Sequence, residues 1–342
     1  WENSMAAHSF SYLRTLCTSI AAGCLGAAVG IVGCSAASGI TPPDASTAVG
    51  SGGSDGSGGV GGAGGSGGCA PDCETSSVSS SSLPDPPDEP DTVFFANTLS
   101  ELFRIDPYKL TIDSVGEFDC IAGGADPVNS KGIWDVAVDA NNKMYGIASS
   151  PVGAELVLID PTNAHCTHVA DLPWQHVGYT LAISFVPKGV LHPDKEILVA
   201  QGLYQLHSID VDNPQLNLLH DVSESMYWYT KAGSDLVSVE GAGTFVVAAQ
   251  QGGQGGYTQY LLKLDVPLGD ISVVGPTGTG STAFFVGAAY WGGTVYSVTR
   301  GGEVYSLDTM SGLATLLNIA VPQGTAFWGA GVSTTVPITP PK

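Results

Sequence analysis

Positive charge is scarce in this chain. It has 11 lysine and arginine residues against 32 aspartate and glutamate residues, which gives a formal net charge of −21 at pH 7. Such a balance argues against nucleic acids and anionic lipid surfaces as partners, because phosphate groups would be repelled. Charged residues of either sign make up only 13% of the chain. This composition suits an exported protein kept soluble by its net charge, and it equally suits a protein with no partner.

Glycine-rich stretches that match catalytic motifs lack the neighbours that those motifs need. Residues 52–56 and 64–68 fit the G-x-S-x-G pattern of a nucleophile elbow, but no strand or helix is predicted beside either of them. Residues 252–256 and 275–280 are not followed by the Lys-Ser or Lys-Thr of a phosphate-binding loop. The first two stretches are therefore predicted to reflect composition alone, and the last two to be turns.

An export signal is predicted at residues 1–33. Arg14 precedes an apolar run over residues 16–32, and the run ends at Ile31-Val-Gly-Cys34. This ending resembles the lipobox of bacterial lipoproteins. The resemblance implies cleavage before Cys34 and a lipid anchor on the Cys34 thiol. Ser35 is not the aspartate associated with inner-membrane retention, so the outer membrane is favoured, on its periplasmic or cell-surface side. The alternatives are an ordinary signal peptide cut near Ala36 and an uncleaved membrane helix.

Residues 34–91 show no periodicity and are predicted to form a disordered tether. Most residues from 50 to 68 are glycine or serine, and residues 83–91 are acidic and rich in proline. Such a segment buries too little apolar surface to offset the entropy lost on ordering. We expect it to hold a folded head away from the membrane.

Four cysteines remain once the signal peptide and Cys34 are set aside. An even number in an exported chain suggests disulfides, and the simplest pairing is Cys69 with Cys73 and Cys120 with Cys166. A metal site around His165, Cys166 and His168 is the alternative, but this spacing matches no structural zinc pattern.

A short motif predicts the fold of the remaining chain. An alternating apolar stretch ends on an aspartate five times, at about 50-residue intervals, in the segments 102–106, 156–160, 206–210, 261–265 and 304–308. Repeats of this length that are carried by short strands are typical of β-propellers. The aspartates precede turn residues and are expected to cap turns by accepting backbone hydrogen bonds.

The fold is therefore predicted to be all-β, a five-bladed β-propeller over residues 92–337 with a short tail at 338–342. The first repeat supplies three strands (93–98, 101–106 and 111–118) and lacks the innermost one, while residues 329–336 supply a single strand. Together they make one blade and close the ring, which removes an unpaired edge. A sixth blade follows only if residues 173–234 divide differently.

The propeller region resembles bacterial repeat proteins whose blades carry Leu-x-x-Ile-Asp-Pro and Trp-Gly-Gly-x-x-Tyr. The first motif occurs at 102–107 and 156–161, and the second at 291–296. The resemblance implies a propeller and says nothing about its function.

Candidate ligand-binding residues lie at the starts of the predicted inner strands and in the links that lead into them. This face gathers aromatic side chains, which anchor peptides or stack on sugar rings. The set is Trp134, Asp135, Trp174, His176, Tyr179, Tyr227, Trp228, Tyr229, Asp235 and Trp328. The alternative is that these rings plug the central channel. Asp135 and Asp235 are the two carboxylates, and their predicted registers differ by about one residue.

The leading functional hypothesis is a non-catalytic binding or scaffolding module for a protein, peptide or glycan, with no cofactor. A second hypothesis is a hydrolase resembling the propeller lactonases, which hold a cation in the channel. A hard cation needs about six oxygen ligands, and Asp135, Thr180 and Asp235 are too few, so no metal ligands are assigned. A third hypothesis is an assembly factor resembling the propeller lipoprotein of outer-membrane barrel insertion, whose family has more blades than this chain can supply. The sequence leaves open whether the protein is an enzyme.

Overall fold

The computed structural model describes residues 94–121, 124–126, 131–150, 153–173, 182–202, 204–222, 234–251, 256–280 and 283–340. Every regular element among them is a β-strand. No helix long and apolar enough to span a membrane occurs in these ranges. The predicted signal peptide, Cys34, the tether and the Cys69–Cys73 pairing all lie outside the described residues.

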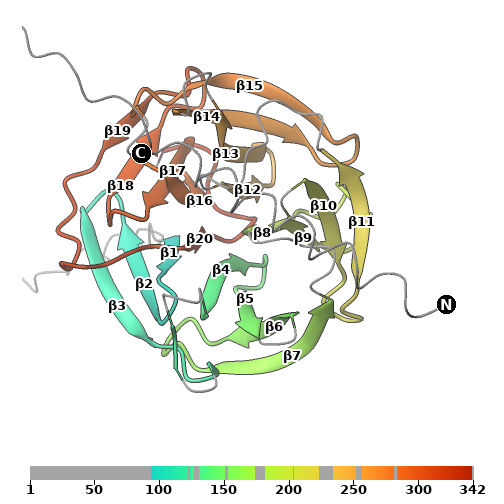
Figure 1. Cartoon of the computed structure of the whole chain (residues 1–342). Coiled ribbons are helices and arrows are strands. Elements are labelled where there is room, and N and C mark those ends of the chain that lie inside the picture. The colour runs from blue at the N-terminus through green and yellow to red at the C-terminus, as the bar shows by residue number, and fades with distance from the viewer. Residues whose placement is uncertain are drawn as a thin grey trace, which may run out of the picture. The chain divides into compact units, whose positions relative to one another are not determined.

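Five four-stranded antiparallel sheets form a ring, which confirms the predicted all-β five-bladed propeller (Figure 1). Blade 1 contains β20 (Gly329–Gly331), β1 (Phe94–Asn97), β2 (Glu101–Asp106) and β3 (Thr111–Glu117). Blade 2 contains β4 (Ile133–Val138), β5 (Met144–Ser150), β6 (Gly153–Ile159) and β7 (Cys166–Pro173). Blade 3 contains β8 (Ala182–Val186), β9 (Ile197–Gln201), β10 (Gln205–Ile209) and β11 (Leu216–Asp221). Blade 4 contains β12 (Asp235–Val239), β13 (Gly243–Gln251), β14 (Tyr257–Asp265) and β15 (Asp270–Pro276). Blade 5 contains β16 (Phe285–Trp291), β17 (Thr294–Thr299), β18 (Val304–Leu307) and β19 (Ala314–Leu316).

The first strand of each blade lines the centre of the ring (Figure 1). All residues of these strands are buried, and each strand packs against the inner strands of the two neighbouring blades. Apolar side chains interleave between the blades. The rings of Phe94 and Tyr296, for example, stack with centroids 5.6 Å apart across the boundary of blades 1 and 5. The core is therefore distributed around the ring, and most residues of its inner strands are apolar.

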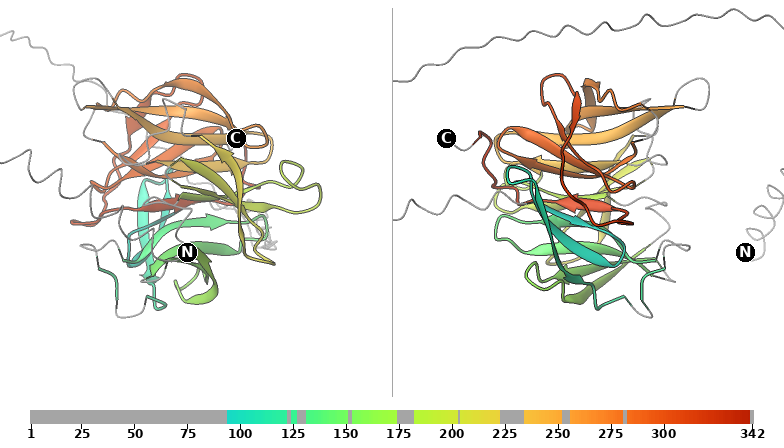
Figure 2. Two further views of the ribbon diagram at one scale, coloured as in Figure 1. Left: turned by 45° about the vertical axis from the view of Figure 1, so that its right-hand side comes forward. Right: turned by 90° about the vertical axis from the view of Figure 1, so that its left-hand side faces the viewer.

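The ring has two flat faces, seen edge-on in the right-hand view of Figure 2. The connection face carries the links from second to third strands and from each fourth strand to the next blade, such as residues 98–100 and 300–302. The turn face carries the links from first to second and from third to fourth strands, such as residues 139–143 and 266–269.

The two ends of the propeller region share blade 1, as the sequence predicts. Phe95 pairs with Gly331, Ala96 with Ala330, and Asn97 with Gly329. The closing strand is shorter than predicted, because it ends at Gly331 and not at residue 336. Beyond it, the chain leaves the sheet and crosses the turn face.

Residues 332–337 bind to the other four blades as they cross. The Ser333 hydroxyl donates to the Asp139 carbonyl of blade 2, at 2.9 Å, and the Thr334 hydroxyl donates to the Glu196 carboxylate of blade 3. The Thr334 carbonyl accepts from Glu240 N–H of blade 4, and the Pro337 carbonyl accepts from Gly292 N–H of blade 5. These bonds fix the segment across the axis of the ring.

The repeated aspartates cap turns, as predicted. Asp106 accepts backbone hydrogen bonds from Tyr108 and Lys109, at 3.0 and 2.9 Å. The other four accept a backbone N–H two or three residues further on: Asp160 from Thr162, Asp210 from Asp212, Asp265 from Leu268, and Asp308 from Met310 and Ser311. Their role is to hold the turns between third and fourth strands.

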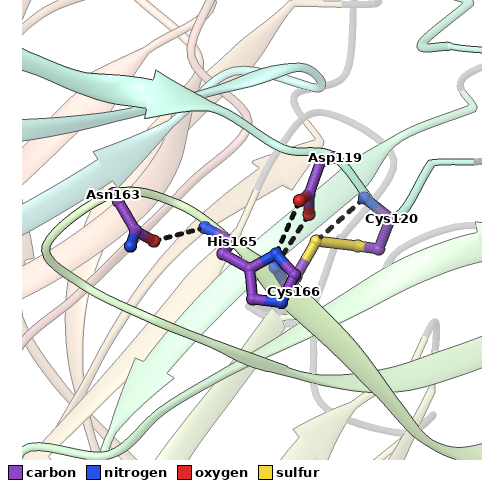
Figure 3. Close-up of polar contacts among 5 residues, drawn as sticks. All are labelled: Asp119, Cys120, Asn163, His165 and Cys166. Carbon is purple, nitrogen blue, oxygen red and sulfur yellow. Dashed lines mark hydrogen bonds and ion pairs between the residues drawn. A yellow bond between two sulfur atoms is a disulfide. The ribbon is translucent and has the colours of Figure 1, made fainter.

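The Cys120–Cys166 disulfide joins blades 1 and 2 (Figure 3). It is the pairing that the sequence analysis favoured. An ion pair lies beside it, since Asp119 accepts from the Cys166 backbone N–H at 3.0 Å and contacts His165 Nδ1 at 2.6 Å. These contacts fasten the segment that follows β3 to the start of β7.

Candidate functional site

Asp135 and Asp235 stand at the same level of the ring. In every blade, the first residue of the repeat motif lies on the third strand and pairs with a residue of the second strand, which in turn pairs with a residue of the inner strand. These three residues form a row across the blade. It ends at Gly329 in blade 1, Asp135 in blade 2, Ala182 in blade 3, Asp235 in blade 4 and Gly287 in blade 5. The predicted offset of about one residue between the two aspartates is therefore wrong. A register shift between Ile133 and Asp135 inserts one extra residue, which the sequence did not reveal.

The two carboxyl groups bind backbone N–H groups that point into the ring. Asp135 accepts from Val136 N–H at 2.8 Å and from Ile183 N–H of blade 3 at 2.6 Å. Asp235 accepts from Leu236 N–H at 2.6 Å and from Ala288 N–H of blade 5 at 2.5 Å.

A fifth donor is Ala330 N–H of blade 1, which also hydrogen-bonds to Asp135. Each of the five blades thus contributes one N–H donor, from the residue directly after the inner-strand residue of its row. Inner strands leave one edge unpaired, and a buried N–H without a partner is costly. The aspartates supply these partners.

Burial raises the pKa of both carboxyl groups well above the ordinary aspartate value. For Asp235 the negative charge of Asp135 raises the pKa further. For Asp135 the backbone hydrogen bonds from Ile183 and Val136 oppose the effect of burial, as does the hydrogen bond from Asp235. The pair as a whole therefore retains a proton above the pH at which an ordinary aspartate loses it.

The aspartate pair closes the ring at its centre. Asp135 is 1% exposed and Asp235 is 0% exposed. Gly329 lies so close to the Asp135 carboxylate that a side chain on it would overlap Oδ1. The hydrolase hypothesis requires the Asp135 and Asp235 oxygens to bind a cation. In the structure these oxygens accept hydrogen bonds from backbone N–H groups instead. Among the described residues, no group of three or more histidine, cysteine, aspartate and glutamate side chains could hold a metal ion.

Trp134 and Trp328 both lie near the central opening on the connection face, at or just before the start of an inner strand. Trp134 is 6% exposed, and Trp328 is half-buried against the same apolar cluster. Trp134 is therefore part of the core between blades 2 and 3. Trp328 keeps part of its surface exposed.

Arg300 is a neighbour that the sequence analysis missed. Its guanidinium lies 4.0 Å from the centroid of the Trp328 ring, in a cation–π contact, and its side chain is exposed. The arginine belongs to the link between β17 and β18 of blade 5, whereas Trp328 enters blade 1. Nothing in a single sequence pairs these two positions.

Buried amide side chains lie at the connection-face ends of second strands. Asn97 ends β1 and Gln201 ends β9, in the same row as the aspartates. Asn97 Oδ1 and Gln201 Oε1 have no hydrogen-bond partner within the described part of the chain. The Gln201 amide N–H donates to the Ser234 hydroxyl at 2.7 Å. These two oxygens add unfilled polar acceptors beneath the connection face.

The remaining candidates lie outside the described residues. They are Trp174, His176, Tyr179, Tyr227, Trp228 and Tyr229, in the links that lead into blades 3 and 4. Their place in a ligand site stays a prediction from the sequence.

No protein-family model matches the chain, and it matches no curated protein sequence. Solved structures resemble it remotely. A chain of a nidogen/laminin complex is 10% identical, with a TM-score of 0.43, over 70% of this chain and 97% of that one. A Bacteroides thetaiotaomicron protein of unknown function is 14% identical, with a TM-score of 0.44, over 71% of this chain and 62% of that one. Virginiamycin B lyase from Staphylococcus aureus is 10% identical, with a TM-score of 0.36, over 68% of this chain and 72% of that one. Similarities this remote carry no argument about ligand or activity.

Proposed function

We propose that this protein is a lipid-anchored module of the cell envelope that binds a protein, peptide or glycan, without catalysis, through its connection face. Cys34 carries the anchor, residues 34–91 form the tether, and the propeller is the binding head. The proposed location is the outer membrane, on its periplasmic or cell-surface side.

The observation that carries the proposal is that the axis of the ring is blocked at two levels. Asp135 and Asp235 fill the centre, and residues 332–337 cross the turn face on hydrogen bonds to blades 2 to 5. A ligand on the axis therefore has only the connection face to bind. Propellers commonly bind at the mouth of the ring, where connections of variable length gather around a rigid scaffold.

The chemistry of this face suits a polar partner with flat or ring-shaped groups. Arg300 presents N–H donors held in place by the Trp328 ring. Stacked arginine and aromatic side chains dominate many protein interfaces, because they lose little freedom on binding. The sequence predicts four further aromatic residues for links on this face, Trp174, Tyr227, Trp228 and Tyr229.

Capture of partners from intact envelopes tests the binding role. We expect Trp174→Ala, Trp228→Ala and Arg300→Ala each to weaken retention of the partner about tenfold or more, with a melting temperature close to that of the wild type. Leu218→Ala is the matched control, because Leu218 is exposed on outer strand β11, away from the connection face. Equal retention by all four variants would remove the proposal.

Fractionation tests the anchor. We expect Cys34→Ala to move the protein from the membrane fraction to the soluble fraction and to abolish palmitate labelling, since the thiol is the proposed attachment point. A Cys34→Ala protein that stays in the membrane would show that another segment holds it there.

A further inference from the structure

A cavity of about 710 Å³ opens away from the connection face, between blades 1 and 2, with Trp291 of blade 5 also in its wall. Strands β1 to β3 form one wall, the turns at Asn142 and Thr162 of blade 2 form another, and residues 332–337 close the third side. Its volume lies within the range of small-molecule sites, about 300–1,000 Å³. None of the residues proposed for the connection face lines it.

The inner part of the cavity is apolar. Phe95 is half-buried, and Val138 and Trp291 are buried. Trp291 is 6% exposed, so only a small part of its ring reaches the cavity.

The outer part of the cavity is polar and accessible. Arg104 and Asp113 are exposed cross-strand neighbours of opposite charge on β2 and β3. Asn142, Thr162 and Thr335 add an amide and two hydroxyl groups around them, all exposed. Donors and acceptors are thus both present, and the two charges cancel. The wall has no net charge with which to select an anion or a cation.

We propose that this cavity binds a small neutral saccharide, one or two sugar units long. Sugars present hydroxyl groups, which both donate and accept, around the edge of a ring whose C–H faces are apolar. That pattern matches a polar outer wall surrounding an apolar, aromatic inner wall. The walls are already assembled, because residues 332–337 are hydrogen-bonded to Asp139, Glu240 and Gly292. The saccharide therefore enters a formed site.

Calorimetric titration of the purified lipid-free chain tests the site, with glucose, galactose, N-acetylglucosamine, maltose, cellobiose and the acid glucuronate as probes. We expect at least one neutral sugar to bind saturably and to change tryptophan fluorescence. Two variants should weaken that binding about tenfold or more. Arg104→Gln removes a guanidinium group that can donate two parallel hydrogen bonds to the sugar. Asp113→Trp places an indole ring in the cavity and so takes up the space for the sugar. Both positions are exposed, so both variants should fold.

Arg300→Gln on the connection face is the matched control and should bind the sugar like the wild type. The inference is overturned if none of the neutral sugars binds, if only glucuronate binds, or if Asp113→Trp binds as well as the wild type. Loss of binding in Arg300→Gln together with its retention in Asp113→Trp would place the sugar on the connection face. That result would overturn this inference and support the proposed function.

Discussion

At the scale of single residues, the chain uses aspartate in two opposite ways. Burial alone would raise the pKa of Asp106, but hydrogen bonds from Lys109 and Tyr108 outweigh it and lower the pKa. In the centre of the ring the balance is reversed, and burial raises the pKa of Asp135 and Asp235 despite their backbone donors. Hydrogen bonds likewise lower the pKa of Asp160, Asp210 and Asp308, so these turn aspartates act as anions, whereas the central pair retains a proton.

The central pair predicts that stability falls as the pH rises above the range in which an ordinary aspartate titrates. A group with a raised folded-state pKa contributes stability that is complete below its unfolded pKa and is lost as the pH rises through the folded pKa. We expect the free energy of unfolding to decrease above the ordinary carboxyl range for the wild type, measured by urea denaturation at several pH values. Asp235→Asn should keep most of the stability and weaken this pH dependence, because the amide imitates the protonated acid and leaves Asp135 as the one titrating carboxyl group of the pair.

Asp235→Ala is the contrasting variant. It leaves Leu236 and Ala288 N–H without a partner and Asp135 buried alone, so we expect a loss of about 3–5 kcal/mol. An identical pH profile for the wild type and Asp235→Asn would show that the pair holds no titrating proton in that range.

The turn aspartates could be assigned from sequence, because an aspartate followed by turn residues has a local partner. The central pair could not, since its partners Ile183 and Ala288 lie about 50 residues away on neighbouring blades. The extra residue beside Trp134 also displaced Asp135 from its apparent register. A bulge of this kind leaves no mark in a period-2 pattern.

At the scale of strands and blades, the sequence pattern predicted five blades and the four strands of blade 1. Alternating runs separated by glycine, proline and aspartate are enough to set strand order when neighbours pair in sequence. The ends differ by a few residues, and most strongly at β20, which is three residues long. There the segment 332–337 finds hydrogen bonds to four other blades and so leaves blade 1 after Gly331.

The boundary of blades 1 and 2 depends on the Cys120–Cys166 disulfide. We expect Cys120→Ser with Cys166→Ser to lower the free energy of unfolding by about 2–4 kcal/mol, because the bond constrains a 46-residue separation in the unfolded chain. Thermal and urea denaturation would measure the loss. Cys69→Ser with Cys73→Ser, outside the propeller, should leave the melting temperature unchanged. Equal stability of both double variants would mean that the Cys120–Cys166 disulfide does not stabilise the propeller.

At the scale of the whole molecule, closure of the ring decides which surfaces are available to ligands. The first repeat lacks its innermost strand and residues 329–336 supply a single strand, and this complementarity predicted the closure. No sequence pattern indicated that residues 332–337 cover the turn face, that Arg300 stacks on Trp328, or that a cavity opens between blades 1 and 2. Each of these is a contact between blades, and a repeat pattern specifies each blade without specifying what its loops touch.

Site-specific photo-crosslinking in intact cells tests most directly whether the partner binds on the connection face. A photoreactive residue is placed at Arg300 on the connection face, at Leu268 on the turn face, or at Leu218 on the outer edge, all three exposed in the structure. We predict a discrete adduct from position 300 alone, lost when Trp174→Ala or Trp228→Ala is added. Adducts from position 268 or 218 with none from position 300 would contradict the account.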